Sequence, residues 1–479
     1  MRIRKRAVRC FLVAATCCAT LAAMATTQSA HAQSLFADAV NAAGPTGYWQ
    51  LNEAGGPTAV NLGTAGGSAN GTYTGSPTFS VAGPSSANGF DGFAPTNTGV
   101  GFPPGSSVSL PTGFLPTSSN PRTYSLWFDA DSGPTNGQAA FSYGNNATGQ
   151  RINISADSDE VAIAVNGHNY GLNGLALSGW NQLAITLPSG TTSSGGFQFY
   201  LNGAPLTGLT NIAGSPQTVN TQNSAGAIGS NVFGGAAFSG SLDEVAVYNG
   251  ALTANEIAHQ YNAALGLETT TTVGLSDFTT VSKSGESPGT SGLFAGPLYV
   301  RERANGANPE LEVEAFIKFD LSGVSGDITS ATLVLPETNK LNNSNSANIF
   351  MAQVLEDWDS MGLDPVFGDG LLDGTDVTGE LLIGTNGVAS AGPAVDIDHF
   401  VDITALAQLW LSDPASNFGL RLRLNDAFVG AAFDANSVRL ILGQQVQVPE
   451  PTSVAAWLLV AGLAMFAAVC RRRKASYGR

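Results

Sequence analysis

Carboxylates are the side chains with the most chemical potential in this sequence. Glu310, Glu312 and Glu314 alternate along one predicted strand, so they share a face, and paired acids of this kind are what glycosidases use. A solvated acidic face that pairs with arginines across a sheet is the favoured interpretation of the same pattern. A second group lies in a glycine-containing segment, where hard oxygen ligands on flexible backbone would suit calcium, although a simple solvated loop is the alternative. Its members are Asp364, Asp369, Asp373 and Asp376.

Two other catalytic patterns fail on chemical grounds. Residues 285–289 fit the nucleophile elbow Gly-x-Ser-x-Gly, but Pro288 follows the serine and has no backbone N–H to stabilise an oxyanion. His168, His259 and His399 are isolated from one another in sequence, so no histidine metal cluster is visible. We therefore expect a protein that is not an enzyme.

The charges separate the chain into a body and two ends. The chain has 479 residues with 20 Lys+Arg and 36 Asp+Glu, a net charge of −16, which argues against a nucleic-acid binder. Ten of the basic residues lie in the first nine and last nine positions, so residues 33–449 hold 10 basic and 35 acidic residues, a net charge of −25. The body has no cysteine and hence no disulfide, because all four cysteines lie in the end segments.

The N-terminal end predicts export. An apolar run over residues 11–25 follows the basic start, and Ala30 and Ala32 form a small-x-small cleavage site. We expect residues 1–32 to be a signal peptide that a signal peptidase removes after Ala32.

The C-terminal end predicts membrane insertion and sorting. Residues 452–470 carry no charge, which suits a transmembrane helix, and four basic residues follow them. Pro449, Glu450 and Pro451 stand directly before this span, and the order of motif, span and basic tail over residues 448–474 resembles the PEP-CTERM sorting signal of certain Gram-negative bacteria. The resemblance implies recognition by an exosortase at an inner-membrane intermediate, and delivery to the cell surface or extracellular matrix. A plain membrane anchor is the alternative.

Residues 34–266 predict an antiparallel β-sandwich. Apolar residues alternate at Phe197, Phe199 and Leu201, and the turn formers Asn202-Gly203 follow at once. Val161, Ile163 and Val165 alternate likewise before Asn166-Gly167. One helix near residues 252–265, capped by Thr253 with Glu256 as its partner, should lie across the sandwich. Trp49, Trp127 and Trp180 sit inside apolar strand patterns and are expected in the core.

Five motifs in this region occur in the order typical of a known family. They span residues 47–53, 89–92, 179–184, 199–203 and 240–245. These motifs resemble those of laminin G-like, concanavalin A-like jelly rolls, which implies a two-sheet sandwich that in relatives often binds glycans, sometimes with calcium. Relatives usually have an aspartate where this chain has Asn61, so calcium there is in doubt. Jelly-roll glucanases carry Glu-x-Asp-x-Glu on their catalytic strand, whereas no glutamate in this sequence has an aspartate two positions later.

Three residues of this domain are candidates for binding. Asp243 is a possible calcium ligand. Its neighbour Glu244 should point to the opposite face of the strand unless a bulge intervenes, so the two side chains would not bind one ion together. A structural role, with one carboxylate accepting backbone N–H groups, is favoured for this pair. Tyr143 and Tyr170 would favour sugar binding if they were exposed in a groove.

Residues 269–443 predict a second antiparallel sandwich. Alternating apolar residues from Leu311 to Phe319 define a half-buried strand. Residues 315–322, 401–404, 409–411 and 417–420 resemble the DNRLRE family of extracellular β-sandwich modules, some of which bind carbohydrate.

The expected protein is therefore all-β and exported. It has two sandwiches that bind glycan, and the acidic body favours neutral or calcium-bridged glycans. One alternative is a structural or adhesive surface protein that recognises protein or acts as a spacer. A divergent polysaccharide hydrolase or lyase is another.

Overall fold

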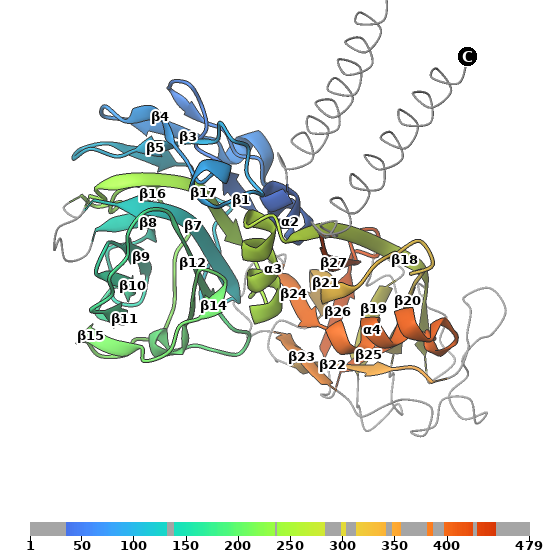
Figure 1. Ribbon diagram of the computed structural model, residues 1–479. Helices are drawn as coiled ribbons and strands as arrows, with labels where there is room; N and C mark the ends of the chain where they lie inside the picture. Colours follow the sequence, from blue (N-terminus) through green and yellow to red (C-terminus); the bar gives the residue numbers. More distant parts are fainter. Residues whose placement is uncertain are drawn as a thin grey trace, which may run out of the picture. The chain divides into compact units, whose positions relative to one another are not determined.

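The computed structural model describes most of the region between the two ends of the chain (Figure 1). The described ranges are 35–131, 138–234, 237–282, 298–302, 313–341, 347–355, 381–386, 397–424 and 429–446. The described residues up to Gln444 belong to one compact unit, and their strands build two sandwiches.

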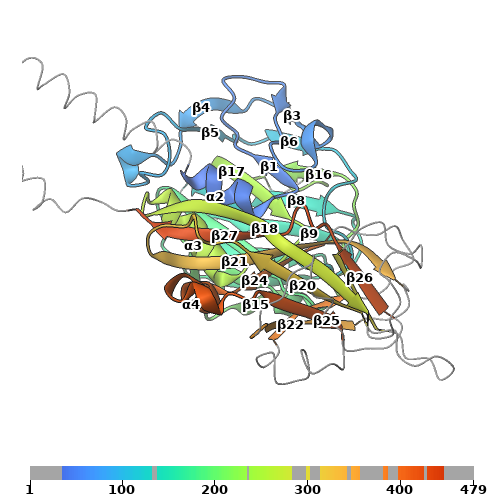
Figure 2. The same cartoon turned by 90° about the vertical axis from the view of Figure 1, so that its right-hand side faces the viewer.

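The first sandwich consists of two antiparallel sheets (Figures 1 and 2). In spatial order, the first sheet holds β14 (Ala204–Pro205), β13 (Gln198–Leu201), β12 (Asn181–Leu187), β7 (Arg122–Ala130), β17 (Gly240–Tyr248), β5 (Thr98–Gly101) and β4 (Thr78–Ala82), with β1 (Gly47–Trp49) paired to β17. The second holds β15 (Thr210–Gly214), β11 (His168–Asn173), β10 (Glu160–Val165), β9 (Arg151–Ala156), β8 (Ala139–Gly144), β16 (Gly226–Ile228), β6 (Ser107–Leu110), β3 (Gly71–Thr74) and β2 (Thr58–Ala59). The two-sheet sandwich predicted for this region is confirmed.

Both predicted hairpins form where the turn residues stand. β10 pairs with β11 across Asn166-Gly167, with Val165 opposite His168. β13 pairs with β14 across Asn202-Gly203, and both turn residues have positive φ, of 51° and 76°. Asparagine and glycine tolerate this region of backbone space, so the local sequence sets the register here.

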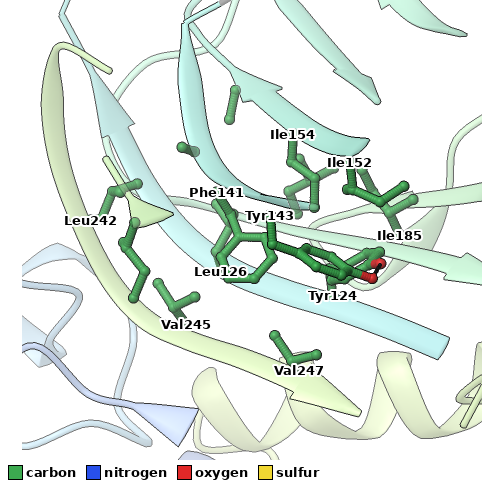
Figure 3. Close-up of a cluster of buried hydrophobic side chains, with 14 of the residues drawn as sticks. Tyr124, Leu126, Phe141, Tyr143, Ile152, Ile154, Ile185, Leu242, Val245 and Val247 are labelled. Atoms are coloured by element: carbon green, nitrogen blue, oxygen red, sulfur yellow. Dashed lines mark hydrogen bonds between the residues drawn. The ribbon is translucent and has the colours of Figure 1, made fainter. Parts of the chain in front are cut away.

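The inward faces of the two sheets make the core of the first sandwich. Figure 3 shows Leu126 and Ile185 of the first sheet facing Phe141 and Ile154 of the second. Trp49 and Trp127 are fully buried and Trp180 is 9% exposed, so the expectation that all three belong to the interior is confirmed.

Two helices cover the outer face of the first sheet. These are α2 (Leu35–Ala43) and α3 (Ala254–Ala264). Thr253 caps α3 as predicted, by accepting the Glu256 backbone N–H at 3.0 Å, but the Glu256 carboxylate does not complete the expected capping pair. Phe36 and Ile257 share a buried cluster with Trp127 of β7, and Val334, Phe400 and Ile441 of the second sandwich join it. The helices are thus held between apolar side chains of both sandwiches.

The second sandwich is one antiparallel sheet folded back on itself (Figure 2). β18 pairs with both β27 and β20, which closes six strands into a ring, while β24 pairs with β21. The strand order is β18 (Glu268–Ser282), β27 (Arg439–Gln445), β21 (Ile328–Leu341), β26 (Val429–Phe433), β19 (Leu298–Glu302), β20 (Val313–Phe319), β25 (Leu420–Leu424), β22 (Ala347–Gln353) and β23 (Leu381–Asn386), with β24 at Ile397–Asp402. Helix α4 (Thr404–Ser412) contributes Ala407 and Trp410 to its core.

One of the three alternating glutamates falls in this described sheet. Glu314 of β20 is buried, and its carboxylate lies 3.6 Å from the Arg421 guanidinium of β25. The predicted pairing with an arginine across the sheet is therefore confirmed for Glu314, but the expectation of a solvated face is wrong for it, because β20 is buried on both faces. Glu310 and Glu312 lie outside the described residues.

Candidate functional site

Asp243 and Glu244 lie on a β-bulge in the middle of β17. The register of β17 against β7 shifts between Asp243 and Ala246, and Glu244 adopts a positive φ of 53°. The bulge brings both carboxyl groups into the protein, where Asp243 is 0% and Glu244 3% exposed. Regular alternation would have placed the two side chains on opposite faces, so the bulge is what makes them a pair.

Hydrogen bonds from neutral groups hold this acidic pair. The Asn97 side-chain amide donates to Asp243 Oδ2 at 2.8 Å, and the Glu244 backbone N–H donates to Asp243 Oδ1 at 3.0 Å. The Tyr48 hydroxyl donates to Glu244 Oε2. The structural role predicted for one carboxylate, accepting a backbone N–H, is therefore confirmed for Asp243.

Burial changes the protonation of the pair. It raises the pKa of Glu244 to about 8, against the opposing effect of the Tyr48 hydrogen bond. Burial, and after it the charge of Glu244, also raises the pKa of Asp243. With a pKa above neutral pH, the Glu244 carboxyl is held protonated at pH 7 in this hydrogen-bonded interior.

The surroundings of Asp243 offer few further metal ligands. Glu53 lies in the same part of the sandwich, but its carboxylate accepts from the Val60 backbone N–H at 2.8 Å and from the Tyr73 hydroxyl at 2.7 Å. Within the described ranges, no group of three His, Cys, Asp or Glu side chains is placed to hold a metal ion.

Asn61 closes a loop as both an acceptor and a donor. Its Oδ1 accepts the backbone N–H groups of Tyr48 at 2.7 Å and Gly63 at 3.1 Å, while its Nδ2 donates to the Gly66 carbonyl at 2.9 Å. A carboxylate cannot donate, so these contacts require the amide. Asn61 thus ties together the backbone at Tyr48, Gly63 and Gly66 by hydrogen bonds.

Neither predicted tyrosine forms a surface platform. Tyr143 does not meet the condition set for a sugar-binding residue, because it is fully buried; its hydroxyl donates to the Pro116 carbonyl at 2.8 Å and lies 2.7 Å from the Tyr124 hydroxyl (Figure 3). Tyr170 is only partly exposed, because its ring packs on Phe199 with a centroid separation of 6.1 Å and so lies against the core.

An exposed aromatic side chain does occur at a different place on the first sandwich. Phe233 follows β16 in a loop and is 50% exposed, with the Arg151 guanidinium 5.5 Å from its ring centroid. Arg151 donates to Asn146 Oδ1 at 2.9 Å and to Asn166 Oδ1 at 3.4 Å. We call these four residues the Phe233 patch. The sequence signal for it was a large aromatic residue between the turn formers Asn231 and Gly234, outside any alternating strand pattern.

The three histidines of the body each have a hydrogen-bond partner inside the protein. His168 Nδ1 lies 2.7 Å from Ser194 Oγ, and both residues are buried. His259 lies 2.6 Å from the Glu268 carboxylate, and His399 lies 2.8 Å from that of Glu337. The contact between His168 and Ser194 resembles a base beside a nucleophile, but Ser194 is fully buried and its Oγ also accepts the Gln217 backbone N–H at 2.8 Å.

Several predicted sites fall outside the described residues. They comprise the aspartate group Asp364, Asp369, Asp373 and Asp376, the cleavage residues Ala30 and Ala32, the sorting residues Pro449, Glu450 and Pro451, and the span 452–470. In the part of the chain that the structure describes, no helix is long and apolar enough to cross a membrane.

Two family models match the chain. Residues 103–258 match Laminin_G_3, described as the concanavalin A-like lectin/glucanases superfamily, and residues 447–474 match the PEP-CTERM protein-sorting motif. A concanavalin A-like domain and a PEP-CTERM motif are therefore present, as the sequence predicted. A search of curated proteins found no match.

Solved structures with similar sandwiches are distant. Domain 4 of AbnA, a GH43 extracellular arabinanase from Geobacillus stearothermophilus in complex with arabinotriose, is 18% identical over 46% of this chain and 98% of its own, with a TM-score of 0.34. A Trypanosoma rangeli sialidase mutant displaying trans-sialidase activity is 15% identical over 47% of this chain and 34% of its own, with a TM-score of 0.29. The botulinum neurotoxin serotype C1 binding domain is 10% identical over 79% of this chain and 99% of its own, with a TM-score of 0.32. At these scores the likenesses carry no argument about this chain.

Proposed function

We propose that this chain is an exported, non-catalytic protein that binds glycan at the cell surface or in the extracellular matrix of a Gram-negative-type bacterium. The observation that carries the proposal is the match of residues 103–258 to the lectin/glucanase superfamily. The PEP-CTERM match at residues 447–474 supports export and processing by an exosortase-type system. Signal cleavage after Ala32 and membrane insertion through residues 452–470 belong to the same proposal.

The Phe233 patch supports glycan as the ligand of the first sandwich. A half-exposed aromatic ring offers an apolar surface to the C–H face of a sugar, and a neighbouring cation and side-chain amides offer hydrogen bonds to its hydroxyl groups. The contacts of Arg151 and the asparagines fix this arrangement before a ligand arrives, which lowers the entropic cost of binding.

The charge of the body supports a neutral glycan. Residues 33–449 carry a net charge of −25, which repels anionic polysaccharides unless calcium bridges the two. A calcium contribution from the aspartates at 364–376 is part of this proposal.

The buried acids support the non-catalytic part of the proposal. A glycosidase needs two carboxyl groups that flank a substrate bond, whereas Asp243 and Glu244 are both buried and hydrogen-bonded to protein groups. The second sandwich, which we propose to be a DNRLRE-like module, would present or extend the glycan-binding domain.

A structural or adhesive role is a second candidate function. It is favoured by the buried cluster that Phe36, Trp127, Val334, Phe400 and Ile441 form between helix and strand residues of both sandwiches, because such a cluster suits a stiff spacer.

Glycan-array binding of the purified full chain, with and without calcium, tests the proposal. Binding to neutral glycans is the expected result. Calcium-independent binding would limit the proposed role of the aspartates, and an array without any bound glycan would favour the structural role.

A further inference from the structure

The Phe233 patch lies on the outer face of the second sheet of the first sandwich. Ser142 of β8 and Arg151 of β9 alternate along their strands with core residues, so their side chains point away from the core. The Val232 backbone N–H donates to Ser142 Oγ at 2.7 Å, which holds the loop that carries Phe233 beside β8. The patch therefore begins at β8 and continues onto β9 through Arg151.

Polar side chains continue the patch across the next two strands of the sheet (Figure 1). Asn166 follows β10, and its Oδ1 accepts from Arg151 at 3.4 Å. Gln217 lies beyond it, because its Cγ is 3.3 Å from the position that a Cβ atom would take on Gly167, the last residue before β11. The distance from β8 to β11 is three strand spacings, or about 14 Å. A ligand that contacts both Phe233 and Gln217 must therefore be longer than one sugar ring.

We call the Phe233 patch together with Gln217 the amide row, and hydrogen bonds fix the loops that carry it. The Gly149 backbone N–H donates to the Asn166 carbonyl at 2.9 Å, and the Asn220 N–H donates to the Gly149 carbonyl at 2.8 Å. The Gln217 backbone N–H donates to the buried Ser194 Oγ at 2.8 Å. The row is thus arranged before a ligand arrives, which lowers the entropic cost of binding.

The amides of the row have donors and acceptors left for a ligand. Asn146 and Asn166 accept from Arg151 through Oδ1, and their Nδ2 groups make no hydrogen bond to the described part of the protein. Gln217 donates through Nε2 to the Ser215 carbonyl at 2.8 Å, which leaves its Oε1 as an acceptor. Because a sugar hydroxyl group both donates and accepts, a row of amides suits a chain of sugar residues.

The segments that form the row contain no acidic residue. These segments are residues 144–151, 166–167, 215–224 and 229–234. Arg151 and the fully buried Arg122 are the only basic residues from position 34 to position 266, so the row carries one accessible charge. Since calcium sites in proteins are built mainly on carboxylates, the row favours a ligand that binds without calcium.

We propose that the amide row binds a segment of several sugar residues of a neutral polysaccharide chain, laid across strands β8 to β11, and that it does so without calcium. Phe233 stacks on one sugar ring, and Gln217 hydrogen-bonds a later residue of the same chain. The inference rests on the proposed function. It adds the length of the ligand, the residue that contacts its far end and the independence of calcium.

Neutral oligosaccharides of increasing length test this assignment. The probes are cello-, laminari-, malto- and manno-oligosaccharides of one to six residues, titrated into the full chain by isothermal titration calorimetry. At least one series should bind, and its affinity should rise at least tenfold from the disaccharide to the hexasaccharide. The affinities should be the same in calcium and in a chelator.

Gln217→Ala separates the far end of the row from the Phe233 patch. The Gln217 side chain donates only to the Ser215 carbonyl, and the backbone contact to Ser194 remains in the variant, so the fold is kept. Gln217→Ala should weaken the hexasaccharide at least fivefold and leave the disaccharide unchanged, whereas Phe233→Ala should weaken both. Asn52→Ala is the matched control and should change neither, because Asn52 is an exposed amide outside the row.

Different failures have different meanings. Equal affinities for the disaccharide and the hexasaccharide, an unchanged hexasaccharide affinity in Gln217→Ala, or loss of binding in the chelator would each overturn the assignment of the amide row, while the proposed function would stand. Absence of binding by all four series, when the array shows another bound glycan, would also refute the amide row alone. Absence of binding in both experiments would overturn both proposals.

Discussion

Replacing Glu244 by glutamine is expected to protect the first sandwich at alkaline pH. Burial raises the pKa of Glu244 from an ordinary 4.5 to about 8 in the folded protein. The folded state therefore holds a proton on this carboxyl over a pH range in which the unfolded chain has lost it. The stability that this proton provides is fully present below pH 4.5 and is lost as the pH rises through about 8.

The size of the effect follows from the same two pKa values. The difference between 4.5 and about 8, at about 1.4 kcal/mol for each pKa unit, corresponds to a loss of about 5 kcal/mol from the free energy of unfolding. Glutamine keeps an oxygen for the Tyr48 hydroxyl and does not ionise. Asp243 also has a raised pKa and remains in the variant, so part of the pH dependence persists. We expect Glu244→Gln to exceed the wild type by on the order of 3–5 kcal/mol at pH 9 and to match it near pH 5.

Urea unfolding at pH 5, 7 and 9, followed by tryptophan fluorescence, measures this difference. Asp91 is an exposed carboxylate of the same sandwich, and Asp91→Asn should reproduce the wild-type profile. Parallel pH profiles for the wild type and Glu244→Gln would refute the assignment of the alkaline loss to this buried carboxyl.

Three other substitutions have expected outcomes. Arg122 is fully buried and donates to several backbone carbonyls, so Arg122→Lys should lower the free energy of unfolding by roughly 3 kcal/mol or more, measured by urea unfolding. Asn61→Asp should lower the free energy of unfolding by about 1–3 kcal/mol, because a carboxylate cannot donate to the Gly66 carbonyl. The melting temperature in the presence of a chelator should fall accordingly, and an unchanged melting temperature would contradict this role. Changing both Pro449 and Pro451 to alanine should abolish delivery to the cell surface, and unchanged surface labelling of intact cells would exclude the sorting motif as the signal.

Local features of the fold were predictable from the sequence. The hairpins at Asn166-Gly167 and Asn202-Gly203 form as expected, because the turn residues and the alternating strands beside them determine the turn and the strand pairing. The cap of helix α3 at Thr253 was predictable for the same reason.

Features that depend on distant residues were not predictable. The bulge at Asp243 and Glu244 arises where β17 pairs with β7, more than 100 positions away in sequence. The residues around Asp243 contain no local pattern that predicts it. The burial of Tyr143 could have been predicted from the alternation of side chains along a strand. Phe141 lies two positions before it, and both side chains face the core (Figure 3). The Phe233 patch joins a loop after β16 to the start of β9, so the sequence could identify an isolated aromatic residue but not its arginine neighbour.

Glycan binding at the Phe233 patch is tested by the affinity of the full chain for the neutral glycan that it binds best on the array. Phe233→Ala removes the exposed ring, whereas Leu62→Ala removes an apolar side chain that is equally exposed, at 50%, elsewhere on the same sandwich. Loss of about 1.4 kcal/mol of stacking corresponds to about a tenfold weaker affinity. A glycan site at the Phe233 patch predicts at least this loss in Phe233→Ala and no change in Leu62→Ala, measured by isothermal titration calorimetry. Equal affinities of the wild type and both variants would contradict a glycan site at the Phe233 patch.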